Sequence, residues 1–106
     1  MTVIIINPNS TASMTDAMLA QARRSAPELA FEGWTSHAGP AAIQGEADGE
    51  AAREPLLELV KRASSQGADG IIIGCFDDTA LDEAAAIADC PVIGIGQASY
   101  HYSGKY

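Results

Sequence analysis

The stretch Gly67–Asp82, which reads GADGIIIGCFDDTALD, constrains the fold of this chain more than any other. It contains three consecutive isoleucines, Ile71–Ile73, between glycines. A short β-branched run of this kind is typical of a strand buried on both faces of a parallel sheet. Cys75 follows at the expected carboxyl end of that strand, which is where open α/β sheets bind their ligands.

The rest of the chain alternates short apolar runs with stretches of helical periodicity. Apolar runs predict strands over residues 3–6, 29–35, 71–73 and 92–95. Helices are expected around Met14, Met18 and Ala22 and over residues 79–88, with a further helix beginning at residues 97–102. Another helix is indicated by the stripe of Ala52, Leu56, Leu59, Val60 and Ala63. Alternation with short connections implies right-handed crossovers and a parallel sheet covered on both faces. The sequence therefore predicts a three-layer α/β fold of the flavodoxin or Rossmann kind, a single domain over residues 1–106 with a four-stranded parallel sheet.

Finer details of the helices follow from their turn and cap residues. Proline is tolerated in the first turn of a helix, so Pro55 predicts that the second helix begins at Arg53 or Glu54. Residues 36–49 before it are expected to form a glycine-containing loop, whose length suggests a functional role. In the third helix, residues 77–79 are expected at the N-cap. Its buried side chains are predicted to be Leu81, Ala84, Ala85 and Ala88.

The charge and cysteine content exclude several classes of function. A formal net charge of −8 argues against binding to nucleic acid or to an anionic membrane, because both need a basic surface. Two cysteines are too few for a disulfide framework and suit a reducing cytosol. The N-terminal run lacks a positive segment and is too short for a signal peptide or a membrane span. We therefore expect a soluble, cytoplasmic protein whose partner is a small molecule.

Two groups of residues could carry chemistry. Cys75 stands where a reactive thiol would meet a ligand, and a buried cysteine that only fills the core is the alternative. A polar turn after the first strand is the second candidate, because amide and hydroxyl groups beside a helix N-terminus can hold a carboxylate or an imide ring. Simple helix capping is the alternative there. The candidate residues of this turn are Asn7, Asn9, Ser10 and Thr11.

Three motifs, in the same order, carry a resemblance to a known family: IIINPNS at the start, GADGIIIGCFDDTALDEA in the middle and PVIGIGQAS near the end. The chain resembles the Asp/Glu/hydantoin racemase superfamily, and the Cys-Phe-Asp-Asp run is characteristic of its hydantoin and allantoin racemase branch. Members of that family are cofactor-independent isomerases with two catalytic cysteines, one in each of two similar α/β halves. The resemblance covers the first half, so it implies one half of a two-domain, pseudo-symmetric racemase fold.

The resemblance also implies roles for individual residues. Cys75 would be one of two thiol acid/bases, and the turn over residues 7–11 would line the substrate pocket. A 5-substituted hydantoin or allantoin is the implied substrate, with an amino acid such as aspartate or glutamate as the alternative, and no metal or organic cofactor is implied. Relatives often carry Ser and Glu where this chain has Ala42 and Gln44, which weakens the expectation of polar contacts from that loop. Further pocket residues implied by the resemblance are Pro40, Ile43, Phe76 and Asp77. Filling the core is the alternative role for Phe76.

The remaining cysteine and the histidines are expected to have no catalytic role. Cys90 precedes the fourth strand, at the opposite end of the sheet from Cys75, and does not match the family's second cysteine. His37 and His101 lack partners at a spacing typical of a metal site or a catalytic triad. Residues 94–96 are not a dinucleotide fingerprint, because the third glycine and the acidic residue downstream are missing.

One thiol cannot deliver protons to both faces of a carbon, so three interpretations of the chain stay open. In the first, it is a truncated racemase with the family fold and little turnover, as its end just after a helix start suggests. In the second, two copies form a homo-oligomer about a two-fold axis, and Cys75 of each copy flanks one pocket. The third is a small-molecule binding or assembly module without catalysis. A single-cysteine decarboxylase or isomerase of the same superfamily is a related enzymatic alternative.

Overall fold

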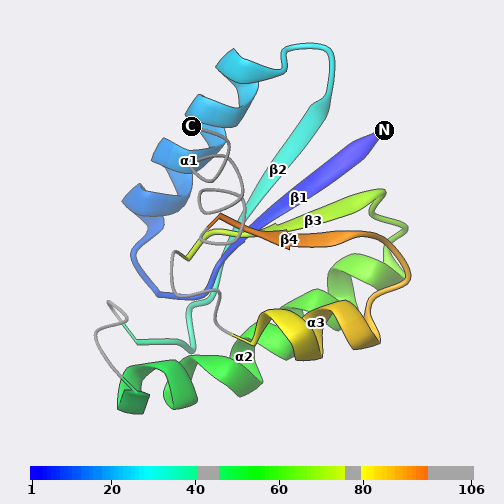
Figure 1. Cartoon of the computed structure of the whole chain (residues 1–106). Helices are drawn as coiled ribbons and strands as arrows, with labels where there is room; N and C mark the ends of the chain where they lie inside the picture. Colours follow the sequence, from blue (N-terminus) through cyan, green and yellow to red (C-terminus); the bar gives the residue numbers. More distant parts are fainter. Residues whose placement is uncertain (41–45, 76–79, 96–106) are drawn as a thin grey trace, which may run out of the picture.

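The computed structural model describes residues 1–40, 46–75 and 80–95. Strands and helices alternate along the chain, as Figure 1 shows. Their bounds are β1 (Thr2–Asn7), α1 (Ala12–Ser25), β2 (Ala30–Thr35), α2 (Glu46–Ser65), β3 (Gly70–Ile73), α3 (Leu81–Ile87) and β4 (Val92–Gly94). The predicted strands are thus confirmed, with small shifts at their ends. The helix expected from residue 97 lies outside the described residues.

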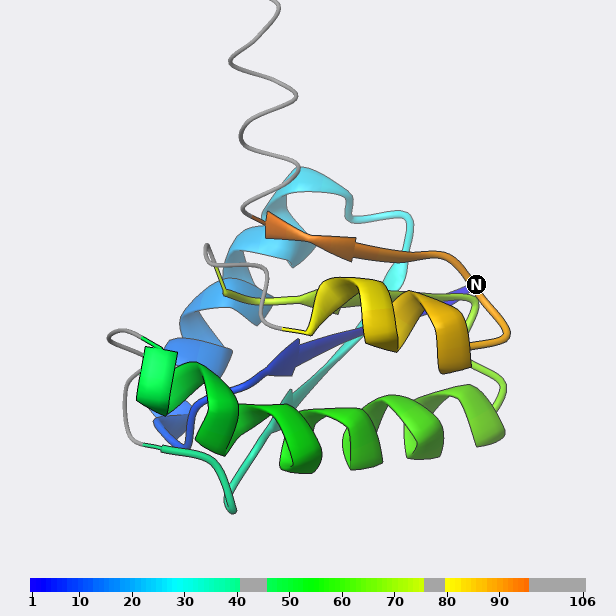
Figure 2. The same cartoon turned by 60° about the horizontal axis from the view of Figure 1, so that its bottom comes forward.

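The four strands form one parallel sheet in the order β2-β1-β3-β4. Helices cover both faces: α2 and α3 lie together on one side of the sheet and α1 on the other (Figures 1 and 2). This is the predicted three-layer α/β fold with a four-stranded parallel sheet. Because all strands run the same way, the residues that follow β1, β2, β3 and β4 meet at one edge, the carboxyl edge of the sheet.

The main core lies between the sheet and helices α2 and α3. Alternate residues of a strand point to opposite faces, and Ile4 and Ile6 of β1 face this core beside Ile71 and Ile73 of β3. All four are at most 1% exposed. Burying an isoleucine side chain stabilises the fold by about 1.5–3 kcal/mol, so these strands anchor the carboxyl edge firmly. The residues of α2 that complete the core are Ala52, Leu56, Val60 and Ala63, all of them predicted, whereas the predicted Leu59 is half-buried.

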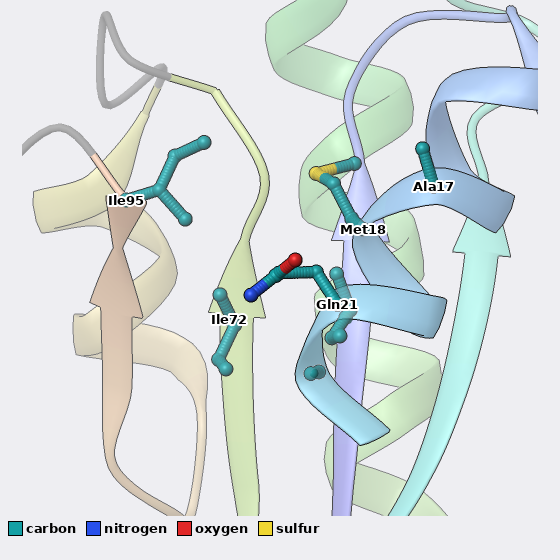
Figure 3. A pocket seen from close by; sticks show the side chains of 7 residues that line it. Ala17, Met18, Gln21, Ile72 and Ile95 are labelled. Carbon is teal, nitrogen blue, oxygen red and sulfur yellow. The ribbon is translucent and has the colours of Figure 1, made fainter. Parts of the chain in front are cut away.

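The opposite face of the sheet is covered only in part. Ile5, Ile72 and Ile93 are neighbours in register across β1, β3 and β4. Ile5 is 3% exposed beneath α1, whereas Ile93 at the far strand is 46% exposed. A hollow of about 390 Å³ lies between, where Met18 and Gln21 of α1 face Ile72 and Ile95 (Figure 3). Its walls are completed by Ile5, Ala17 and Ala22.

Helix α1 buries a different set of residues from the predicted one. Met14 was expected on the buried stripe with Met18 and Ala22, but it is 47% exposed. Thr15 is the buried residue of this turn, at 3% exposure. The reason is that α1 crosses over β1 and β2 with Thr15 against Gly33, where the missing side chain makes room for a β-branched residue.

The predicted start of α2 was wrong. The helix begins at Glu46, so Pro55 lies in its interior rather than in its first turn, and residues 46–49 of the expected loop belong to the helix. A proline inside a helix removes one backbone hydrogen bond. Burial of Ala52, one turn before Pro55, favours continuing the helix across that gap. Gly67 follows the end of α2 with a φ of +83°, a backbone conformation that glycine adopts readily after a helix.

The third helix is also shorter and less buried than predicted. It runs over Leu81–Ile87, and Ala80 occupies its N-cap with a left-handed φ of 52°. Residues 77–79, which were expected at the N-cap, lie outside the described residues. Of the four side chains expected to be buried, only Ala84 is, whereas Ala85 is exposed and Leu81 and Ala88 are half-buried. A helix of seven residues has only two turns, so few of its side chains can face α2 and β4. This explains why fewer residues are buried than predicted. No helix among the described residues is long and apolar enough to cross a membrane.

Candidate functional site at the carboxyl edge of the sheet

Buried polar residues gather at the carboxyl edge of the sheet. Within the residues that the structure describes, four polar side chains are buried: Asn7, Asn9, Thr15 and Ser36, with exposures of 0%, 6%, 3% and 2%. Asn7 ends β1, Asn9 and Ser36 follow β1 and β2, and Thr15 lies in the first turns of α1. Burying a polar group costs free energy unless it is hydrogen-bonded. Their concentration at one edge therefore marks this edge, and not the apolar core, as the candidate functional site.

The turn that follows β1 is held by asparagine side chains. Asn7 Nδ2 donates to Asn9 Oδ1 at 2.9 Å and to the Thr11 carbonyl at 3.1 Å. Asn7 Oδ1 accepts from the Asn9 backbone N–H at 3.1 Å, and Asn9 Oδ1 accepts from the Thr11 N–H at 2.9 Å. Asn9 Nδ2 also approaches the Met14 sulfur at 3.6 Å. Both asparagine side chains are thus used to shape the turn, while Ser10 and Thr11 stay half-buried at its surface.

A second set of hydrogen bonds joins this turn to α1 and β2. Asn7 Nδ2 lies 3.0 Å from Thr15 Oγ1. Thr15 Oγ1 lies in turn 2.7 Å from Thr35 Oγ1, at the end of β2. Thr35 is also the register partner of Asn7 in the sheet. One buried network therefore fixes the ends of β1 and β2 and the start of α1 relative to one another.

The loop after β2 closes against the same turn. The Ser36 N–H donates to the Asn7 carbonyl at 3.0 Å, and the Ser10 N–H donates to the Pro40 carbonyl at 2.8 Å. Gly39 lies between these bonds, directly against the Pro8 carbonyl oxygen. The predicted site residues Ser10 and Pro40 are thus brought into contact. Ser36 Oγ is buried with no hydrogen-bond partner in the described part of the chain.

Cys75 is placed beside this turn by the register of β1 and β3. Ile6 and Ile73 are partners, and the Gly74 N–H donates to the Ile6 carbonyl at 2.9 Å, which extends the pairing past the last residue of β3. The Cys75 N–H then donates to the Ile73 carbonyl at 3.0 Å, so the backbone turns sharply at this point. Cys75 is half-buried. The Cys75 backbone therefore lies at the edge where β1 opens into its turn, and the Cys75 side chain packs against the main core.

The start of α1 is directed at the same edge. Its N-cap residue is Thr11, whose side chain makes no capping hydrogen bond, and its first turn carries no acidic residue. Backbone N–H groups at such a helix start favour anionic or polar groups. The helix start and the half-buried Ser10 hydroxyl therefore offer polar groups at the edge of the sheet where Cys75 follows β3.

The other predicted residues fall into two groups. Ile43, Phe76 and Asp77 lie outside the described residues. Cys90 lies at the amino edge of the sheet, before β4, away from Cys75. Desolvation, with smaller contributions from the charges of Asp89 and Asp69, raises the pKa of the Cys90 thiol, which favours the neutral form.

Three residues of this edge are absent from the sequence-based prediction: Thr15, Thr35 and Ser36. Thr15 could have been noticed, because it is a polar residue that shares a helical face with Met18 and Ala22. Thr35 and Ser36 carry no such signal, since strand ends commonly contain hydroxyl residues. Among residues 1–40, 46–75 and 80–95, no three His, Cys, Asp or Glu side chains are grouped so as to hold a metal ion.

Comparisons with known proteins agree with this architecture. The chain is 41% identical over 106 residues to a hydantoin racemase of Rhizobium meliloti, covering 93% of this chain and 42% of the relative. It is 33% identical over 105 residues to a hydantoin racemase of Paenarthrobacter aurescens, covering 97% of this chain and 44% of the relative. The solved structure of an allantoin racemase from Klebsiella pneumoniae superposes with a TM-score of 0.94 at 34% identity.

That superposition covers 99% of this chain and 43% of the Klebsiella protein. The chain thus spans less than half the length of each of these relatives. The family model described as Asp/Glu/hydantoin racemase matches residues 3–105, which is nearly the whole sequence. By this match, the chain belongs to the Asp/Glu/hydantoin racemase family.

Proposed function

We propose that this chain supplies one half of a racemase site for 5-substituted hydantoins or allantoin, with Cys75 as one of two thiol acid/bases. The observation that carries the proposal is the position of Cys75: it follows a central strand, beside a buried polar turn, in a chain whose relatives are racemases of these compounds. Aspartate and glutamate racemisation, which the family description also includes, is the alternative within the same chemistry.

In the proposed reaction the Cys75 thiolate removes the proton at the stereocentre of the substrate. The C–H bond breaks, the proton moves to the sulfur, and the electron pair passes into the adjacent carbonyl as an enolate. A second thiol on the opposite face donates its proton to the carbon, which inverts the configuration. Both proton transfers use protein thiols, so the proposed reaction is independent of metals and organic cofactors.

The turn over residues 7–11 has two roles in this proposal. Ser10 and Thr11, with the backbone N–H groups at the start of α1, contact the polar atoms of the substrate and stabilise the negative charge of the enolate. Asn7 and Asn9, whose amides are engaged within the turn, hold these groups in place. Pro40 borders the pocket through its contact with Ser10, and we place Ile43, Phe76 and Asp77 on the same border from the family resemblance.

The second thiol must come from outside the site that Cys75 occupies, because one sulfur reaches only one face of a carbon. We propose that the chain is a single α/β domain equivalent to the first half of its relatives. A homo-oligomer in which Cys75 of a second copy faces the first would complete the pair. Light scattering tests this part directly: a monomer at working concentration would rule out the two-copy arrangement while leaving the role of Cys75 in place.

Ligand-protected alkylation tests whether Cys75 lies in the substrate site. The chain would be treated with iodoacetamide in the presence and absence of a single enantiomer of 5-benzylhydantoin, and labelling of Cys75 and Cys90 would be measured by peptide mass spectrometry. We expect the hydantoin to slow labelling of Cys75 and to leave Cys90 unchanged, because the two thiols lie at opposite edges of the sheet. Equal labelling of Cys75 with and without ligand would contradict the proposed site.

Proton exchange at the stereocentre of the substrate separates the enzymatic proposal from a binding module. A chain that protects Cys75 but never exchanges the substrate proton would be a small-molecule binding or assembly module. A single-cysteine decarboxylase or isomerase would turn over a substrate without racemising a hydantoin. We also propose a cytoplasmic location, which suits a reactive thiol.

A further inference from the structure

Helix α1 buries a hydroxyl where its periodicity calls for an apolar side chain. Thr15 lies one turn before Met18 and Leu19 on the face that packs against the sheet, and it is 3% exposed. A buried hydroxyl stabilises a fold only when it is fully hydrogen-bonded. Local departures from the expected pattern concentrate at functional sites. Thr15 is therefore a candidate for a role beyond packing.

The Thr15 hydroxyl is bonded on both sides. It lies 3.0 Å from Asn7 Nδ2 and 2.7 Å from Thr35 Oγ1. A hydroxyl group has one hydrogen to donate and two lone pairs to accept with, so Thr15 accepts from the Asn7 amide while it shares a proton with Thr35. Valine has the same shape and offers neither interaction.

The Thr11 carbonyl and the Asn9 N–H decide which way the Asn7 amide faces, and the Thr15 hydroxyl holds the amide in that position. Only the NH2 group of Asn7 can donate to the Thr11 carbonyl, so its oxygen faces the Asn9 N–H, 3.1 Å away. A reversed amide would set its oxygen against the Thr11 carbonyl and Asn9 Oδ1, and it would leave the Asn9 N–H without its acceptor. The orientation of Asn7 therefore determines the hydrogen bonds of the turn.

The methyl group of Thr15 fixes its own rotamer. Its Cγ2 atom lies against Gly33 of β2, so closely that a Cβ atom at position 33 would be 3.0 Å from it. Strand β2 thus contacts Thr15 twice, through the backbone at Gly33 and through the hydroxyl of Thr35. The two contacts together aim the Thr15 oxygen at Asn7.

We propose that the Thr15–Thr35 hydroxyl pair is a positioning device of the racemase site: it holds the Asn7 amide in place, and Asn7 fixes the turn over residues 7–11 at the edge that Cys75 shares. The consequence for ligand binding rests on the proposed function. The effect on the turn is independent of it, because it follows from the hydrogen bonds alone.

Isosteric variants separate the hydroxyl from the methyl group. Thr15→Val keeps the contact with Gly33 and removes the hydrogen bonds, whereas Thr15→Ser keeps the hydroxyl and removes the methyl group. Thr35→Val removes the hydrogen bond between Thr15 and Thr35 by changing the other partner. This variant replaces Thr15→Val in the test if Thr15→Val fails to fold. Ser13→Ala, an exposed site in the same helix, is the matched control.

The first readout is amide hydrogen exchange of Asn9 and Thr11, whose N–H groups are bonded within the turn. We expect Thr15→Val and Thr35→Val to speed their exchange by about fivefold or more, the change that corresponds to one buried hydrogen bond. Ser13→Ala should leave the rates near those of the parent chain, and Thr15→Ser, which keeps the hydroxyl bonded to Thr35, should give rates closer to the parent than either valine variant does. The Asp69 N–H, bonded to the Thr2 carbonyl at the other edge of the sheet, reports any general loosening.

The second readout is binding of 5-benzylhydantoin, followed by NMR titration. Weaker binding to both valine variants, restored in Thr15→Ser, is the expected result. Unchanged exchange at Asn9 and Thr11 in the valine variants, or equal acceleration at Asp69, would overturn the inference. If the parent chain binds no hydantoin, the proposed function fails, and the exchange rates still decide whether the hydroxyl pair holds the turn.

Discussion

Gly39 lies against the carbonyl oxygen of Pro8, so closely that a Cβ atom at position 39 would collide with it. The contact is between backbone groups of two loops, one after β1 and one after β2. Neither group can move without disturbing its neighbours, because the Gly39 N–H is bonded to the Ser36 carbonyl and the Ser10 N–H to the Pro40 carbonyl. The polar edge of the sheet therefore depends on a glycine at this position.

We expect Gly39→Ala to destabilise the protein by about 1–3 kcal/mol, the usual cost of forcing extra atoms into a packed site. Gly49→Ala is the matched control, because nothing lies within 4 Å of a Cβ atom at that helical position. It should stabilise the chain by about 0.5–1 kcal/mol, since alanine favours a helix more than glycine does. Urea denaturation of both variants checks this, and equal stabilities would contradict the contact.

The two faces of the sheet should respond differently to truncated side chains. Ile73 is fully buried under α2 and α3, whereas Ile93 is 46% exposed on the opposite face. We expect Ile73→Ala to lower the free energy of unfolding by about 2–5 kcal/mol, and Ile93→Ala by less than about 1 kcal/mol. A large loss from Ile93→Ala would show that another surface covers the β4 side of the sheet in solution.

Removing the Ser36 hydroxyl tests whether this buried group lacks a hydrogen-bond partner in solution. Its Oγ atom is buried without a hydrogen-bond partner among the described residues, which costs about 1–3 kcal/mol for a typical group. Ser36→Ala should therefore leave the free energy of unfolding unchanged or raise it by up to about 1 kcal/mol. Thermal or urea unfolding measures the change. A clear loss of stability would mean that the hydroxyl has a partner in solution.

The pKa of Cys90 gives a prediction for pH dependence. Burial and the nearby charges of Asp89 and Asp69 raise this pKa in the folded state. Alkylation of Cys90 should therefore reach half its maximal rate at a higher pH in the folded chain than in urea. By linkage, the neutral thiol contributes stability below its ordinary pKa, and this contribution is lost as the pH rises through the folded value. Identical profiles for folded and unfolded chains would contradict the shift.

The architecture was largely predictable from the sequence, because apolar residues recur in it as short runs or at helical spacing. The three isoleucines of β3 and the spacing of Leu56, Val60 and Ala63 indicate a buried strand and an amphipathic helix without any tertiary information. The start of α2 was not predictable, because packing of Ala52 outweighs the local preference of Pro55 for a first turn. Local propensity is a weak guide where tertiary contacts compete with it.

The candidate site was predictable only in part. Asn7, Ser10, Pro40 and Cys75 meet at one edge because strand direction and connection order dictate it. Which polar side chains face inward was not predictable: the partnership of Thr15 with Thr35 depends on how α1 crosses β2, and no short-range pattern encodes that crossing. Buried polar networks are set by tertiary geometry, so they appear only once the sheet and α1 are in place.

Proton exchange at C5 of a single-enantiomer 5-benzylhydantoin in D2O, followed by NMR, tests the role of Cys75 most directly. The chain would be compared with buffer, with Cys75→Ala and with the matched control Cys90→Ala. We expect the parent chain and Cys90→Ala to accelerate exchange above the rate in buffer, and Cys75→Ala to leave it at that rate. Loss of optical rotation during exchange would reveal a second proton donor. Equal exchange in the chain and in Cys75→Ala would contradict the assignment of Cys75 as the thiolate base.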